Sequence, residues 1–323
     1  MTGQSKFNTR RWARCALPLL MVATLPAFAH NNNAYVANYN DNTVSVVDTI
    51  RNTVSATIPV GTSPSGVAVS PDGSTVYVAN FGNDTVSVIN AASNAVSATV
   101  PVGGAPAAVT VSPNGAYVYV VNSNSNTVSV IAASNDTVAA TVSVGEQPFS
   151  LAVSPNGANV YVGNLGSENV SVINVSNNTV SATVALGDDP YSLAVSPDGA
   201  HVYATAFNAG NVSVISTRSN TVTSTIGAGS GANALALQFF GALMYVANYN
   251  ANTVSVITPF DGKAVETVTV GVGPDALAVS CGNVYVANSG SNTVSVINPF
   301  GGSLATVNVG NDPVAVATQP VNW

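Results

Sequence analysis

Carboxylates and aromatic rings are the side chains of this sequence that could contact a ligand. A carboxylate accepts hydrogen bonds from hydroxyl and amide groups, and a ring supplies apolar area at low entropic cost, so together they suit a sugar or a peptide. We predict a ligand-binding face from residues that vary between segments that are otherwise alike. These are Glu146, Phe149, Asp188, Asp189, Tyr191 and Asp275, with Tyr39, Phe81, Phe207 and Tyr249 around them.

Histidine, lysine and arginine are absent from the loop segments that carry these candidates. A Ser-His-Asp arrangement needs a histidine base, and an oxyanion or enolate needs a donor or a cation that stabilises it. His201 follows the turn at residues 197–199, and we expect it on the opposite face as an ordinary turn residue. The sequence therefore assigns no catalytic and no cofactor-binding residue, and it favours a protein that is not an enzyme.

The acids leave one alternative open. Asp188 and Asp189 are adjacent and stand beside Pro190 and Tyr191, so they could hold a divalent cation or a ligand hydroxyl. Three or more acids within reach of one cation would favour a small-molecule enzyme of lactonase or lyase type. Solvated loop charge that keeps the protein soluble is the interpretation that the sequence favours.

Residues 1–29 have the pattern of a secretory signal peptide. Four basic residues and a short apolar stretch precede an AxA signal at Ala27, Phe28 and Ala29. We expect export by the Sec or the twin-arginine route, cleavage near Ala29, and a periplasmic, secreted or cell-surface protein. Cleavage leaves three basic residues against fourteen acidic ones, a net charge of −11. That charge excludes nucleic acid as a partner, and no later apolar run is long enough to span a membrane.

A repeat organises the remaining chain, residues 30–323. Each unit carries four short segments in which apolar and polar residues alternate, and this alternation indicates half-buried β-strands. Four strands in each period of about 40 to 45 residues are typical of a propeller blade. A tyrosine marks each unit at a spacing of 42 residues five times and then 40: Tyr35, Tyr77, Tyr119, Tyr161, Tyr203, Tyr245 and Tyr285.

The two ends of the repeat region indicate a closed ring. The chain starts at Ala34 with a second-strand segment, and residues 313–320 match the first-strand pattern that the N-terminal unit lacks. Proline at Pro59 and Pro101 marks the fourth strands as outer edges, because proline cannot donate to a sheet ladder. The prediction is an all-β, seven-bladed β-propeller with four antiparallel strands per blade, closed by the C-terminal strand in the N-terminal blade.

One stretch departs from the repeat. Ala206 replaces an asparagine, Ala232 replaces a proline, and Gln238, Phe239 and Phe240 replace a Ser-Pro-Asp type of turn. Two exposed phenylalanines in a turn would form a candidate contact patch.

The repeats resemble a known family. The sequence YVAN at residues 35–38 and 245–248, the SPDG turns, the TVSV strands and the GxxP connections resemble YVTN-type propeller repeats of bacterial periplasmic and archaeal surface-layer proteins. The resemblance covers essentially all of the mature chain and implies the propeller fold, while propellers host many functions. The favoured function is an exported, monomeric, non-catalytic propeller that binds a protein, a glycan or an envelope polymer, without a cofactor.

Overall fold

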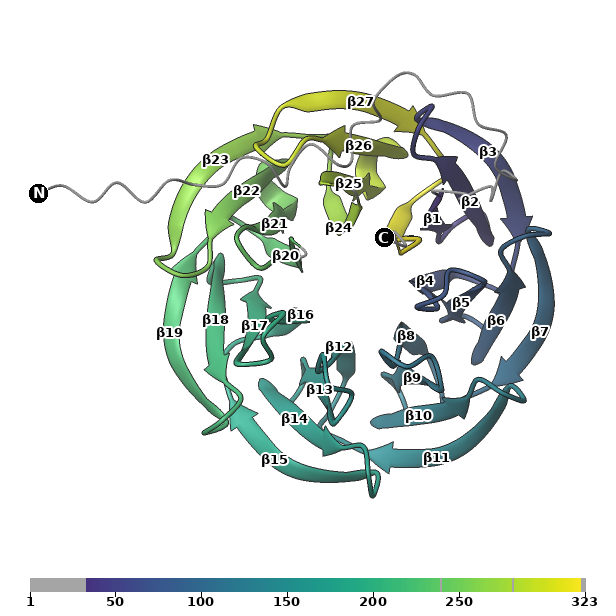
Figure 1. Ribbon diagram of the computed structural model, residues 1–323, viewed down its shortest axis with the longest axis horizontal. Coiled ribbons are helices and arrows are strands. Elements are labelled where there is room, and N and C mark those ends of the chain that lie inside the picture. The colour runs from purple at the N-terminus through teal and green to yellow at the C-terminus, as the bar shows by residue number, and fades with distance from the viewer. Residues whose placement is uncertain (1–32, 239, 281, 321–323) are drawn as a thin grey trace, which may run out of the picture. The chain divides into compact units, whose positions relative to one another are not determined.

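Seven small sheets form the protein. The computed structural model describes residues 33–238, 240–280 and 282–320. Within these ranges, strands form seven four-stranded antiparallel sheets that stand around a central axis like blades (Figure 1). The predicted seven-bladed β-propeller is confirmed. The predicted signal peptide and Phe239 lie outside the described ranges, so export and cleavage near Ala29 stay predictions.

In six blades the strands run outward from the axis in chain order, and in the seventh the last described strand takes the innermost place. The innermost strands are β4 (Pro64–Val69), β8 (Pro106–Val111), β12 (Pro148–Val153), β16 (Pro190–Val195), β20 (Ala232–Leu237), β24 (Pro274–Ser280) and β28 (Pro313–Thr318). The second strands are β1 (Asn33–Asn38), β5 (Thr75–Asn80), β9 (Tyr117–Asn122), β13 (Asn159–Asn164), β17 (His201–Ala206), β21 (Met244–Asn248) and β25 (Asn283–Asn288).

The outer half of each blade follows the same order. The third strands are β2 (Thr43–Asp48), β6 (Thr85–Asn90), β10 (Thr127–Ala132), β14 (Asn169–Asn174), β18 (Asn211–Ser216), β22 (Thr253–Thr258) and β26 (Thr293–Ile297). The outermost strands are β3 (Thr53–Pro59), β7 (Ala95–Pro101), β11 (Thr137–Ser143), β15 (Thr179–Ala185), β19 (Thr221–Gly227), β23 (Lys263–Thr269) and β27 (Ser303–Asn308). Two 3-10 turns follow β21 and β25, at Tyr249–Ala251 and Ser289–Ser291.

The first and last strands of the propeller close the ring. β28 pairs antiparallel with β1, with Val316 opposite Val36 and Thr318 opposite Ala34. Gln319 donates its backbone N–H to the Asn33 carbonyl at 2.9 Å, and its side-chain oxygen accepts the Asn33 N–H at 3.1 Å. The chain ends therefore share one blade, as predicted.

The apolar core lies between neighbouring blades. Tyr77 and Val88 of one blade pack with Val118 and Val120 of the next, and equivalent clusters repeat around the ring. Full burial of one valine contributes roughly 1.5 to 3 kcal/mol, so each blade depends on both of its neighbours. Pro59 and Pro101 end β3 and β7, the outermost strands, as the edge-strand prediction requires.

A buried asparagine braces most blades on one face. Asn80 donates through Nδ2 to Thr85 Oγ1 and to Ser87 Oγ, at 3.0 Å in each case. It also packs under Gly61, whose added Cβ would lie 2.5 Å from Asn80 Cγ. The same residue recurs as Asn38, Asn122, Asn164, Asn248 and Asn288, while Ala206 stands in its place in β17.

That face, which we call the mouth face, carries two sets of loops. One set joins second to third strands, and the other joins an outermost strand to the next innermost strand. Backbone hydrogen bonds tie the two sets together, such as Tyr39 N–H to the Asp312 carbonyl at 2.9 Å. Asp84, with a φ of 57°, accepts the Ala105 N–H at 2.8 Å, so its carboxylate holds two loops together.

Candidate functional site

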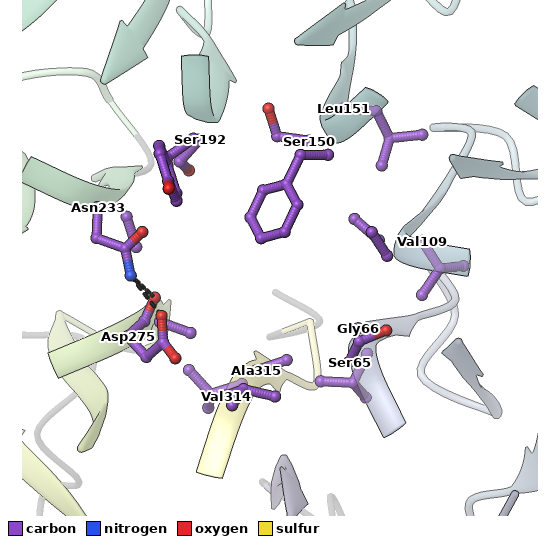
Figure 2. Close-up of a pocket in the computed structure, with 18 of the residues that line it drawn as sticks. Ser65, Gly66, Val109, Ser150, Leu151, Ser192, Asn233, Asp275, Val314 and Ala315 are labelled. Atoms are coloured by element: carbon purple, nitrogen blue, oxygen red, sulfur yellow. Dashed lines mark hydrogen bonds between the residues drawn. The ribbon is translucent and has the colours of Figure 1, made fainter. Parts of the chain in front are cut away.

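A cavity of about 510 Å³ lies on the propeller axis, and residues of all seven innermost strands line it (Figure 2). Each of these strands begins with a buried proline, or with Ala232 in β20. The next residue of each strand lines the cavity, and we call these seven places the wall positions. They are Ser65, Ala107, Phe149, Tyr191, Asn233, Asp275 and Val314.

The side chains at the wall positions differ from blade to blade, so the polar groups and the rings lie in different parts of the cavity wall although the blades repeat. Asn233 and Asp275 are neighbours and supply amide and carboxylate groups, while Phe149 and Tyr191 supply two neighbouring rings. Figure 2 shows Ser192, Asn233 and Asp275 on one side of the cavity, with Val109 across it. Because the backbone is nearly the same in every blade, the side chain at each wall position decides what this cavity can contact.

Asp275 is the charged group of the wall. Asn233, which is buried, donates through Nδ2 to the Asp275 carbonyl at 3.1 Å and also to the Asp275 carboxylate. Burial raises the pKa of Asp275 to about 6; the hydrogen bond from Asn233 opposes this shift, and the charge of Asp312 adds to it. A carboxylate with a pKa near neutrality is ionised at pH 7 and still basic enough to accept a proton from water.

Tyr191 joins the polar side to an aromatic row. Its ring lies 5.4 Å from that of Phe149, edge to face, and 4.9 Å from that of Phe207, between centroids. Phe207 in turn lies 6.2 Å from Tyr249, and Tyr39 lies 6.4 Å from Phe81. Burial raises the pKa of the Tyr191 phenol, and the charges of Asp189 and Asp275 add to the shift. The phenol therefore stays protonated and can donate a hydrogen bond.

Three serines lie on the innermost strands at the cavity. Ser65 donates to the Pro106 carbonyl at 2.7 Å and Ser150 donates to the Pro190 carbonyl at 3.1 Å, so these hydroxyl groups link neighbouring blades. Ser192 Oγ instead accepts the Leu235 N–H at 3.3 Å, which leaves the hydroxyl hydrogen available for a ligand. Ser192 and Tyr191 are thus neutral donors on the same strand, β16.

The structure brings together about half of the predicted ligand-binding face. Tyr39, Phe81, Phe149, Tyr191 and Asp275 line the cavity, and Phe207 and Tyr249 continue its aromatic row. Glu146, Asp188 and Asp189 are not among the lining residues.

The three acids outside the cavity have other surroundings. Glu146 is exposed, Asp188 accepts the Asp189 N–H at 2.8 Å, and Asp189 accepts from Asn208 at 3.1 Å. Ligand binding by this face stays a prediction.

Asn233 and Ser192 were missed by reasoning from the sequence. The signal was available for Asn233, because it occupies the position of Tyr191 and Asp275 when the repeats are aligned. Ala232 aligns with the prolines that precede Tyr191 and Asp275, so the repeat alignment already placed Asn233 at the equivalent position.

No group of three or more His, Cys, Asp or Glu side chains in the described part of the chain could hold a metal ion. The cation of the alternative interpretation thus has no such ligand group in these ranges. None of the helical segments in the same ranges has the length and apolar character needed to cross a membrane.

Two family models match parts of the chain. A model described as "Lactonase, 7-bladed beta-propeller" matches residues 28–141, and one described as "YNCE-like beta-propeller" matches residues 95–218. Among curated proteins, the PE-PGRS family protein PE_PGRS18 of Mycobacterium tuberculosis is 59% identical over 39 residues, which are 12% of this chain and 8% of that protein. The matched segment is therefore a small part of that relative's length.

Solved structures share the fold across most of the chain. The periplasmic gluconolactonase PpgL of Pseudomonas aeruginosa has a TM-score of 0.72 and 23% identity, over 90% of this chain and 99% of that chain. A Bacteroides uniformis protein provisionally assigned as a 6-phosphogluconolactonase has a TM-score of 0.74 and 20% identity, over 89% and 99%. The hydrazine synthase of Kuenenia stuttgartiensis has a TM-score of 0.76 and 21% identity, over 83% and 92%.

These comparisons correct the function favoured by the sequence. A non-catalytic binding or envelope-interaction propeller is the wrong interpretation, because the lactonase family model that matches residues 28–141 points to the enzyme alternative. The physical error was to equate missing histidine and cations with missing chemistry, whereas burial, with a smaller contribution from the charge of Asp312, raises the pKa of Asp275 to about 6. The chain is a seven-bladed β-propeller whose matched family models are those of lactonase and YNCE-like propellers.

Proposed function

We propose that this protein is a lactonase that opens a small lactone ring by hydrolysis in the axial cavity. One observation carries the proposal: Asp275, with a pKa raised to about 6, stands at the cavity wall of a propeller that a lactonase model matches over residues 28–141. The cavity is concave, mostly apolar and supplied with a few convergent polar groups, as small-molecule sites usually are.

Asp275 acts as the general base. Its ionised carboxylate takes a proton from a water molecule as the water oxygen attacks the lactone carbonyl carbon. Asn233 is a positioning residue, because its Nδ2 donates to both the carbonyl and the carboxylate of Asp275 and so fixes the carboxylate against the wall. The ring C–O bond then breaks, and the proton held by Asp275 passes to the departing alkoxide. The product is a hydroxy acid.

One neutral donor of β16, the Ser192 hydroxyl or the Tyr191 phenol, stabilises the oxyanion that forms on the carbonyl oxygen, because successive side chains of a strand point to opposite faces. The Ser192 hydroxyl and the Tyr191 phenol lie on adjacent residues of β16, beside Asn233 in the ring. Neutral donors fixed before the reaction stabilise developing charge without reorganisation. The product carboxylate is an anion beside Asp275 and near Asp312, so charge repulsion favours its release.

The remaining expectations belong to this proposal. We propose that the enzyme is exported, processed near Ala29 and monomeric, that its repeats are of the YVTN type, and that it works without a bound cofactor. The support is the sequence pattern at residues 27–29, the repeat motifs, and the protein groups of the wall, which supply a base and donors themselves.

Proton release during lactone opening tests the function. A panel of γ- and δ-lactones is followed at constant pH with the native protein, Asp275→Asn and a control, Asp136→Asn. Asp136 also has a pKa raised by burial, but it lies on the β10–β11 turn, where asparagine suits its φ of 54°.

We expect Asp275→Asn to lower kcat/KM by about 100-fold or more, the usual contribution of a general base. The control keeps its activity. Opening of no lactone, or full activity of Asp275→Asn, would overturn the proposal.

A further inference from the structure

We infer that the cavity takes an uncharged, hydroxylated lactone and discriminates against phosphorylated and other anionic lactones. The inference rests on the proposed lactonase function and adds the substrate class. Its basis is the sign and the position of every charged group near the axis.

Among the described residues, no cationic side chain lines the cavity. The wall positions include one acid, Asp275, and the other residues that line the cavity are uncharged. A phosphate group placed there would lose its water shell without gaining a cation as partner. Transfer of an unpaired charge from water into such a site is strongly unfavourable. An anionic substituent therefore weakens binding wherever it points along the wall.

The cations of the described ranges lie away from the mouth face. Arg51 and Arg218 stand on turns between third and outermost strands, and Lys263 begins β23, so all three lie at the opposite ends of their blades. Arg51 pairs with Asp48 at 2.6 Å, and Lys263 pairs with Asp261 at 3.1 Å. These side chains cannot reach a substrate in the cavity.

The approach to the cavity is also acidic. The mouth-face loops carry carboxylates and no lysine, arginine or histidine. The charge of Asp312 acts on Asp275, and that of Asp189 acts on Tyr191, so these acids contribute to the potential at the wall. A field of one sign at the mouth lowers the local concentration of like-charged substrates. The acids of these loops are Asp41, Asp84, Glu146, Glu168, Asp188, Asp189 and Asp312.

The uncharged part of the wall fits a hydroxylated ring. Phe149 is 38% exposed and contacts the Tyr191 ring edge to face, so the pair offers an apolar corner of two inclined rings against which the C–H face of a sugar-like ring can pack. Asp275 accepts hydrogen bonds from substrate hydroxyl groups as well as from the attacking water. The wall therefore complements a substrate ring that has hydroxyl groups along one edge and an apolar C–H face.

A matched substrate pair tests the inference. We compare a hexono-δ-lactone with its 6-phosphate at low ionic strength, and we expect kcat/KM to be at least about 100-fold higher for the neutral compound. The second protein is Ser65→Lys, which adds a cation at a wall position two blades from Asp275. This variant raises the phosphate-to-neutral activity ratio by about tenfold or more. Equal activity on both lactones, or preference for the phosphate, overturns the inference.

Binding of the corresponding lactams separates this inference from the proposed function. Calorimetric titration uses the neutral hexonolactam and its 6-phosphate, which bind without being hydrolysed, and we expect only the neutral compound to bind. Binding of the neutral lactam without opening of any lactone would overturn the proposed function alone. Tighter binding of the phosphate would overturn the substrate class alone, and binding of neither compound would overturn both.

Discussion

The charge of Asp275 should make the native protein less stable at neutral pH than a variant without it. Asp275→Asn removes the carboxylate but keeps a side-chain oxygen that can accept from Asn233. The pKa of Asp275 is about 6 in the folded protein against 3.8 ordinarily. Between these values the folded state holds a proton that the unfolded chain has released, so the free energy of unfolding falls as pH rises through this window.

The size of the effect follows from the shift. About two pKa units correspond to roughly 3 kcal/mol, and contact of the carboxylate with water in the cavity lowers this figure, so we expect about 1 to 3 kcal/mol. Asp275→Asn should therefore exceed the native protein in stability by that amount near pH 8. The two proteins should differ by less than about 0.5 kcal/mol near pH 3.5, where both states are largely protonated.

Denaturant titration of both proteins at the two pH values measures this difference. Hydrogen bonds lower the pKa of several other carboxylates, and these groups lose their stabilising contribution as pH falls. This loss is the same in the native protein and in Asp275→Asn, so it cancels in the difference between them. The carboxylates concerned are Asp41, Asp48, Asp72, Asp198 and Asp261. A difference between the two proteins that is the same at both pH values would refute a desolvated charge at Asp275.

Four further predictions follow from particular residues. The kcat/KM for lactone opening should rise with pH through about 6 and then level off, because Asp275 must lose its proton to act as base; a profile flat from pH 5 to 8 would contradict this assignment. Gly61→Ala should lower the free energy of unfolding by about 1 to 3 kcal/mol, since its Cβ would lie 2.5 Å from Asn80 Cγ. Gly227→Ala, whose Cβ would have nothing within 4 Å, should change the free energy of unfolding by less than about 0.5 kcal/mol. Denaturation midpoints compare the two variants, and equal effects would argue against the bracing role of the buried asparagine. Truncation after Asp312 removes β28 and exposes the partners of Val316, so the product should aggregate or melt well below the intact protein, and an unchanged melting temperature would refute the shared blade. The exported protein should begin at or near His30 by intact-mass analysis, and retention of Met1 would count against cleavage.

The fold could be predicted because its determinants recur in the sequence. The tyrosine spacing fixes the blade count, and the first-strand pattern at residues 313–320 fixes the closure that β28 and β1 make. Pairing of the outermost strands is limited to one side, which the prolines at Pro59 and Pro101 already indicate.

The site could be predicted only in part, because it is assembled from single residues of seven separate strands. Phe149, Tyr191 and Asp275 vary between repeats, and this variation identified them. Asp188 and Asp189 vary too, but they follow Gly187 at a φ of 74° in the loop before β16 and do not line the cavity.

The raised pKa of Asp275 could not be predicted from its neighbours in the chain. The shift of its pKa depends first on burial by the wall and then on Asn233 and Asp312, each of which belongs to another blade. Periodicity places a carboxylate at the axis but does not reveal how much water reaches it. The sequence therefore could not reveal a carboxyl group with a pKa of about 6 at the axis.

A crystal structure with a bound neutral hexonolactam is the most direct test of where the chemistry occurs. We predict density for the lactam in the axial cavity, with its ring against Phe149 and Tyr191 and its carbonyl oxygen within hydrogen-bond distance of the Ser192 hydroxyl or the Tyr191 phenol. Asp275 should face the carbonyl carbon across one water molecule. Density for the lactam outside the cavity, with the cavity holding only water, would contradict the assignment of the lactonase site to the propeller axis.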